Sequence, residues 1–241
     1  MAIHRSTLRD KKNTLSLDEL HLNNESREEI NQLLEEFTFL EALKKYDIPV
    51  ANKILLHGHT GCGKTATAHA IGQALKREVV TLNLGGFVSS KLGETGKNVT
   101  DVFRKASFGD TVLFIDEFDF IGKIRDYDNQ DSGEMKRLVN TLIQQIDQLP
   151  EDTLLICATN HVEVIDTALL RRFQIKLKYQ LPSHEKLDLY YDDILERFPE
   201  GIARIKRTYG ISYAEAKDVA YQQIKTNIIN QEKLKSISEV N

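Results

Sequence analysis

Hydrophobic residues along the chain form short runs that alternate with segments of helical periodicity. Apolar runs bounded by polar residues predict five strands, at residues 52–58, 77–84, 110–117, 152–160 and 173–181. Apolar residues spaced three or four positions apart predict helices between most of these strands. Such alternation is typical of a mostly parallel sheet with helices on both faces. We therefore expect an α/β fold.

The segments on either side of this pattern differ from it. Residues 25–46 predict one long amphipathic helix, and the basic segment before it predicts a solvated tail. After residue 181 the strand pattern stops and only helical periodicity remains, with apolar residues four apart at Ala216, Ala220, Ile224 and Ile228. We predict three regions: a tail at 1–15, an α/β nucleotide-binding domain at 16–181 and a small helical domain at 182–241.

Length and composition exclude several classes of protein. The 241 residues suit one α/β domain with a small accessory domain, and no apolar run approaches the roughly 18 residues of a membrane span. The formal net charge of −4 provides no general attraction to nucleic acid or to an anionic membrane. The two cysteines, Cys62 and Cys157, lie in a loop and a buried strand, where reduced side chains are expected. These features predict a cytoplasmic protein without a membrane partner, and they disfavour a nucleic-acid partner.

The stretch GHTGCGKT, at residues 58–65, is a candidate phosphate-binding loop between a strand and a helix. Its glycines allow backbone N–H groups to surround an anion, Lys64 can reach the outer phosphates, and the Thr65 hydroxyl can bind Mg²⁺. We read the neighbouring His57 and His59 as loop residues. The predicted nucleotide-binding residues of this segment are Gly58, Thr60, Gly61, Cys62, Gly63, Lys64, Thr65 and Ala66.

Two adjacent acids follow the third strand, in TVLFIDEFDF. Ligands of parallel α/β sheets bind beyond the carboxyl ends of the strands, so Asp116 can help to hold Mg²⁺ and Glu117 can deprotonate a water molecule. This pair favours hydrolysis of a nucleotide, with Thr65 and Asp116 as the metal-binding residues. We read Asp119 as a loop or structural residue.

The next two polar positions each allow two interpretations. Asn160, at the end of LLICATN, is either a turn residue or an amide that meets the attacking water. Arg171 and Arg172 end a short predicted helix capped by Asp166. They either complement the helix C-terminus or act as an arginine finger.

The stretches GHTGCGKT, LFIDEFD, CATN and IDTALLRRF, in this order, resemble the AAA family of P-loop ATPases, and the resemblance extends over nearly all of the chain from about Leu17. It implies a P-loop NTPase sheet of the AAA type with a small C-terminal helical lid. It also implies roles for individual residues: Lys64 and Thr65 as Walker A, Asp116 and Glu117 as Walker B, Asn160 as sensor 1, Arg171 and Arg172 as finger residues, and Ala214 as a backbone contact to the nucleotide.

The resemblance further implies Mg²⁺-dependent hydrolysis of ATP by a ring of identical subunits, usually a hexamer, that remodels or unfolds a protein client. An arginine supplied by a neighbouring subunit contributes about 10³- to 10⁵-fold to such reactions, so assembly would complete each active site. Two other functions stay open: an ATP-switched oligomeric scaffold, and a DNA-associated member such as a helicase loader.

Some positions depart from the family pattern. Lys91 replaces the aromatic residue of the first pore loop, and His59 and Thr60 replace two prolines of the phosphate loop. The pattern is most similar to compact stand-alone bacterial members, some of which accompany a subtilisin-like peptidase. By this analogy such a peptidase is one candidate client.

Overall fold

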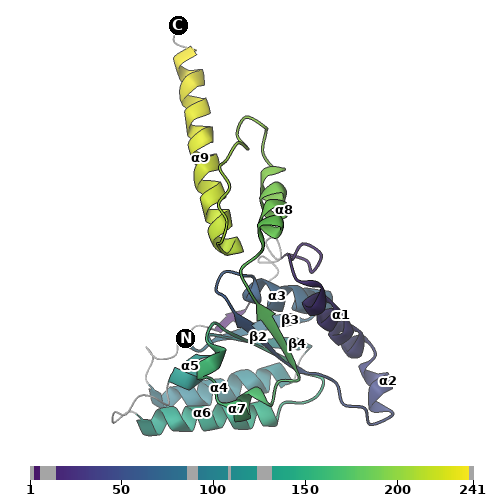
Figure 1. Ribbon diagram of the computed structural model, residues 1–241. Coiled ribbons are helices and arrows are strands. Elements are labelled where there is room, and N and C mark those ends of the chain that lie inside the picture. The colour runs from purple at the N-terminus through teal and green to yellow at the C-terminus, as the bar shows by residue number, and fades with distance from the viewer. Residues whose placement is uncertain (1–2, 6–14, 86–91, 108–109, 124–131, 239–241) are drawn as a thin grey trace. The chain divides into compact units, whose positions relative to one another are not determined.

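A single sheet forms the centre of the N-terminal part of the protein (Figure 1). The computed structural model describes all residues except 1–2, 6–14, 86–91, 108–109, 124–131 and 239–241. Its six strands lie in the order β1-β3-β4-β5-β2-β6. Five of them are parallel and confirm the predicted α/β fold: β2 (Lys53–Gly58), β3 (Glu78–Asn83), β4 (Thr111–Asp116), β5 (Leu154–Thr159) and β6 (Ile175–Tyr179).

The apolar runs of the central strands are buried because helices cover both faces of the sheet. All residues of β5 and four consecutive residues of β4 are buried. On one face, α4 (Leu92–Ser107) and α6 (Ser132–Asp147) pack against Leu113 and Ile115. On the other face lies α3 (Lys64–Ala74), where the His69 ring meets the Phe114 ring edge-on. Successive residues of a strand point to opposite faces, which explains this division.

Strand β1 (Ile3–Arg5) was not expected, because the sequence predicts a tail there. It pairs antiparallel with β3, with Ile3 opposite Leu82. Three residues are too short a segment to show a periodicity, and their pairing depends on an edge that only the folded sheet provides.

The prediction of one long helix at 25–46 was wrong. The segment forms α1 (Asn24–Thr38) and α2 (Leu40–Lys44), which are separated at Phe39. Asn23 caps α1 by accepting a hydrogen bond from the Ser26 N–H at 2.7 Å. The apolar periodicity continues across the break, so it did not reveal the interruption.

The residues after 179 form a helical unit of their own. By its internal contacts this unit contains residues 180–241 together with loop residues 59–63. Its core consists of α8 (His184–Leu195) and α9 (Tyr213–Ser238), packed around Tyr191, Ala216 and Ala220. The predicted apolar stripe of α9 is buried as far as Ile224, whereas Ile228 is 38% exposed.

Three short elements complete the described part: α5 (Phe120–Lys123), η4 (Val162–Val164) and α7 (Thr167–Leu170). The Asp166 carboxylate caps α7 by accepting from the Ala168 N–H at 2.6 Å, as the sequence predicts. No helix within the described residues is long and apolar enough to cross a membrane. Lys91, the proposed pore-loop position, lies outside the described residues.

Candidate functional site

The predicted phosphate loop lies between β2 and α3. The φ angles of Gly58, Gly61 and Gly63 are 117°, 70° and 100°. Residues with a Cβ rarely adopt these positive values. Gly58 also passes so close to the Tyr179 carbonyl of β6 that a Cβ would overlap with it. The glycines are therefore required by the backbone path of the loop.

Lys64 begins α3 with a buried side chain that is 8% exposed. Its ammonium group donates a hydrogen bond to the Gly58 carbonyl at 2.7 Å, which holds the side chain over the start of the loop. The Tyr179 hydroxyl donates to Thr67 in the next turn at 2.7 Å. These contacts attach the first turns of α3 to the ends of β2 and β6.

Positive charge gathers beside the end of β2. Burial lowers the pKa of His57, and the ammonium groups of Lys178, Lys64 and Lys176 lower it further by repelling a proton. The same lysines supply cationic charge around the imidazole. Such a field favours the binding of an anion.

Thr65 and Asp116 are brought together from two elements that are distant in sequence. The Thr65 hydroxyl on α3 lies 3.4 Å from Oδ2 of Asp116, at the end of β4. Hydroxyl and carboxylate oxygens suit Mg²⁺, which usually takes one or two protein ligands and completes its shell with water and phosphate oxygens. The described residues contain no cluster of three His, Cys, Asp or Glu side chains that could hold a metal by themselves. The site thus fits Mg²⁺ bound together with a nucleotide.

Glu117 follows Asp116 in an unusual backbone conformation. Its φ angle is 55°, one of few positive values among the described non-glycine residues. Its N–H donates to Oδ1 of Asp116 at 2.9 Å, and the next residue, Phe118, bonds to the Ala158 carbonyl of β5 at 2.8 Å. Residues held in sparsely populated backbone conformations cluster at functional sites.

Asn160 follows β5, beside the end of β4, and is exposed. Its neighbours on both sides, Thr159 and His161, belong to one hydrogen-bond network. Thr159 donates through its hydroxyl to Oδ1 of Asp119 at 3.0 Å and accepts from the His161 N–H at 3.0 Å. Asp119, which is 5% exposed, is therefore structural, as the sequence suggested, but it also fixes the backbone around Asn160.

Replacing Asp119 by alanine should lower the free energy of unfolding by about 1–3 kcal/mol, because a buried hydroxyl loses its acceptor. Urea unfolding would measure this change. Asp119→Asn keeps an acceptor oxygen and should be affected less. Equal stability of the alanine variant and the wild type would contradict the structural role of the network.

The two arginines after α7 differ in their surroundings. Arg172 donates from Nε and Nη2 to the Asp147 carboxylate at 2.6 and 2.9 Å, and from Nη1 to the Ala168 carbonyl at 2.7 Å. This hydrogen bonding lowers the pKa of Asp147. The exposed Arg171 side chain makes no hydrogen bond or ion pair with any residue that the structure describes. The structure therefore separates two residues that the sequence could not distinguish.

Loop residues 59–63 contact the start of α9 within the C-terminal unit. The Gly61 carbonyl accepts a hydrogen bond from the Ala214 N–H at 3.1 Å. Ser212 and Glu215 form a capping box, in which the Ser212 N–H donates to the Glu215 carboxylate at 2.8 Å. Cys62 is buried, whereas Thr60 is exposed and Ala66 is half-buried on α3. The Ala214 N–H thus bonds to the phosphate loop, and the contact of Ala214 with a nucleotide stays a prediction.

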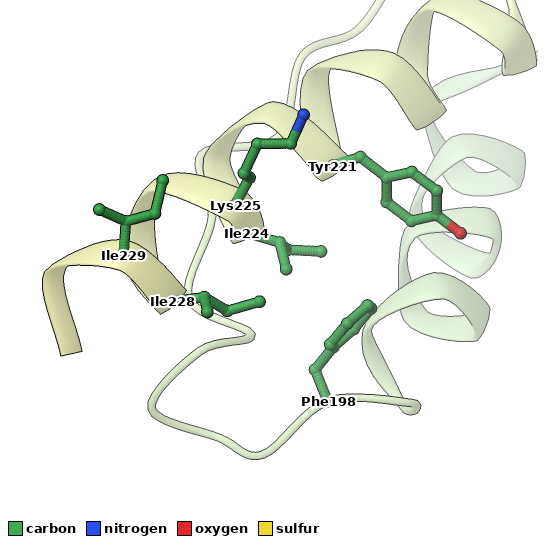
Figure 2. Close-up of a pocket in the computed structure, with 6 residues that line it drawn as sticks. All are labelled: Phe198, Tyr221, Ile224, Lys225, Ile228 and Ile229. Carbon is green, nitrogen blue, oxygen red and sulfur yellow. The ribbon is translucent and has the colours of Figure 1, made fainter. Parts of the chain in front are cut away.

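An apolar groove of about 280 Å³ lies on the C-terminal helices (Figure 2). Five apolar or aromatic side chains and one lysine line it: Phe198, Tyr221, Ile224, Lys225, Ile228 and Ile229. None of the predicted site residues of the described chain is among them. With no acid and a single charged group, this groove lacks the features of a nucleotide site.

The sequence of this chain is similar to those of known ATPases. A family model described as "ATPase family associated with various cellular activities (AAA)" matches residues 54–181. An uncharacterized AAA family ATPase of Sinorhizobium fredii is 32% identical over 204 residues, covering 83% of this chain and 62% of the relative. A putative 26S proteasome regulatory subunit homolog of Methanothermobacter thermautotrophicus is 27% identical over 164 residues, covering 67% and 44%. The chain spans less than two thirds of the length of these relatives.

Among solved structures, the crystal structure of the FIGL-1 AAA domain superposes with a TM-score of 0.64 at 22% identity. The similarity covers 76% of this chain and 61% of that one. At this identity the likeness concerns the fold alone.

Proposed function

Because the chain belongs to the AAA family of ATPases, we propose that it binds ATP with Mg²⁺ at the phosphate loop and hydrolyses it in an assembly of identical subunits. The observation that carries this proposal is the placement of Thr65 and Asp116. The Thr65 hydroxyl, at the start of α3, and Oδ2 of Asp116, at the end of β4, lie 3.4 Å apart, which is close enough for both to serve one Mg²⁺ site.

The loop and α3 supply the groups that bind phosphate. Backbone N–H groups around Gly61 and Gly63 suit the phosphate oxygens, and the helix N-terminus adds a favourable partial charge. Lys64, now bonded to the Gly58 carbonyl, carries the charge that would turn to the outer phosphates. The three lysines near His57 strengthen the attraction.

Hydrolysis needs a base and a group that orients water. Mg²⁺, when bound, would neutralise charge that develops on the phosphate oxygens. Glu117 would accept the proton of the attacking water, since its carboxylate is exposed at the end of β4. Asn160 would orient this water from β5, with its backbone held by the Asp119 network.

The arginines point to an active site completed by another subunit. Arg171 has an exposed side chain that is not engaged by the described residues of its own subunit. We assign it as the finger that reaches the ATP of a neighbour, whereas Arg172 anchors α7 to Asp147 at the end of α6. A hexameric ring of identical subunits suits this arrangement.

A protein client is the partner class best supported. The relative from Methanothermobacter thermautotrophicus is named a putative 26S proteasome regulatory subunit homolog, which supports the remodelling or unfolding of proteins by this chain. The association with a subtilisin-like peptidase and the role of Lys91 stay predictions of the sequence resemblance.

Phosphate release per subunit should rise steeply with protein concentration, because each active site forms only between subunits. A colorimetric phosphate assay over a hundredfold range of concentration, paired with size measurements by light scattering, tests this. Lys64→Ala, which removes the phosphate-binding charge, and EDTA, which removes Mg²⁺, serve as controls. A specific activity independent of concentration would contradict the shared site.

A further inference from the structure

Gly85 lies two residues after the end of β3 and beside Glu117. Strands β3 and β4 run parallel, and the Leu84 N–H donates to the Asp116 carbonyl at 3.2 Å. The segments that follow the two strands therefore lie side by side. A Cβ built on Gly85 would overlap with Oε2 of Glu117, while its contact with Asn83 at 3.4 Å would be ordinary.

Glycine is required at position 85 because a larger side chain would overlap with Glu117, and not because of the backbone conformation. Gly85 is not among the glycines with positive φ, so its backbone would accept alanine. The unusual backbone belongs to Glu117 instead, whose φ of 55° is held by the hydrogen bonds of its own N–H and of Phe118. The Glu117 carboxylate occupies the volume that a side chain at position 85 would fill.

We propose that Gly85 is a positioning residue for Glu117, because its missing side chain leaves the space in which the carboxylate rests. The inference depends on the proposed function, in which Glu117 accepts the proton of the attacking water. A base must lie within hydrogen-bonding reach of its proton, and a displacement of about 1 Å can reduce a rate on the order of 10²-fold.

The test is Gly85→Ala in the full chain. Turnover at saturating ATP should fall about 10²-fold, whereas the Kd of a fluorescent ATP analogue and the Tm should stay as in the wild type. The binding affinity and the Tm should hold because only the end of a flexible side chain has to move. Gly133→Ala on α6 is the matched control, since a Cβ there meets no atom of the described residues within 4 Å.

A double variant shows whether the effect acts through Glu117. Glu117→Asp shortens the side chain by one methylene and withdraws the carboxylate from position 85. Adding Glu117→Asp to Gly85→Ala should therefore reduce turnover much less than it does in the wild type, whereas independent effects would multiply.

Several outcomes would overturn the inference. Normal turnover of Gly85→Ala, multiplicative effects in the double variant, or a lower Tm with loss of ATP binding would each show that the side chain at 85 does not act by displacing Glu117. Glu117→Gln in the same assay separates this failure from that of the proposed function. If Glu117→Gln hydrolyses ATP normally, Glu117 is not the base, and the proposed function fails independently of Gly85.

Discussion

Replacing Arg171 by alanine should reduce ATP turnover by on the order of 10³-fold or more, while ATP binding and assembly size stay close to those of the wild type. In the role proposed for it, Arg171 acts on charge that develops on the transferring phosphoryl group, so its loss should affect the transition state more than the bound nucleotide. Phosphate release at saturating ATP, together with a binding titration, would measure the two effects separately.

Arg172→Ala is the matched variant, because it removes the same side chain from the adjacent position. It breaks the contacts with Asp147 and Ala168, and we expect a lower Tm with a much smaller loss of turnover. Asp147→Ala should reproduce this result. If Arg172→Ala lost turnover and Arg171→Ala retained it, the assignment of the two arginines would have to be reversed.

A mixing experiment tests whether Arg171 acts between subunits. Arg171→Ala subunits keep an intact Glu117, whereas Glu117→Gln subunits keep an intact Arg171. Mixed assemblies should therefore hydrolyse ATP at sites where an Arg171 from one variant faces a Glu117 of the other. Failure to recover activity in assemblies shown to contain both variants would contradict a finger supplied in trans.

Glu117→Gln should lower turnover by about 10²- to 10⁴-fold, because an amide of the same shape cannot take a proton from water. Binding of ATP should persist, since Lys64, Thr65 and Asp116 remain. Single-turnover hydrolysis and nucleotide titration would distinguish loss of chemistry from loss of binding.

Glu28→Gln is a suitable control for this change of charge, because Glu28 is an exposed residue of α1. It should leave turnover unchanged. A Glu117→Gln variant that failed to bind ATP would mean that Glu117 contributes to the nucleotide site rather than to the chemical step.

Much of the fold could be predicted because its signals are local. Buried parallel strands require apolar runs, and covering helices require apolar residues at helical spacing, so both appear directly in the order of residues. The glycines of the phosphate loop, the acids after β4 and the cap of α7 are likewise specified within a few positions. From these features the sequence predicts the five parallel strands, the order of the site motifs along the chain and the family resemblance.

Contacts between distant residues were decided only by the tertiary structure. The pairing of β1 with β3 depends on an edge that the folded sheet provides. Arg172 differs from Arg171 because Asp147, at the end of α6, lies within reach of only one guanidinium. Gly85 lies against Glu117 because the parallel strands β3 and β4 end side by side, which no local pattern of side chains records. The sequence by itself thus determined which groups the candidate site contains. Three-dimensional packing decided which of these side chains are engaged by other residues, because their partners lie far away along the chain.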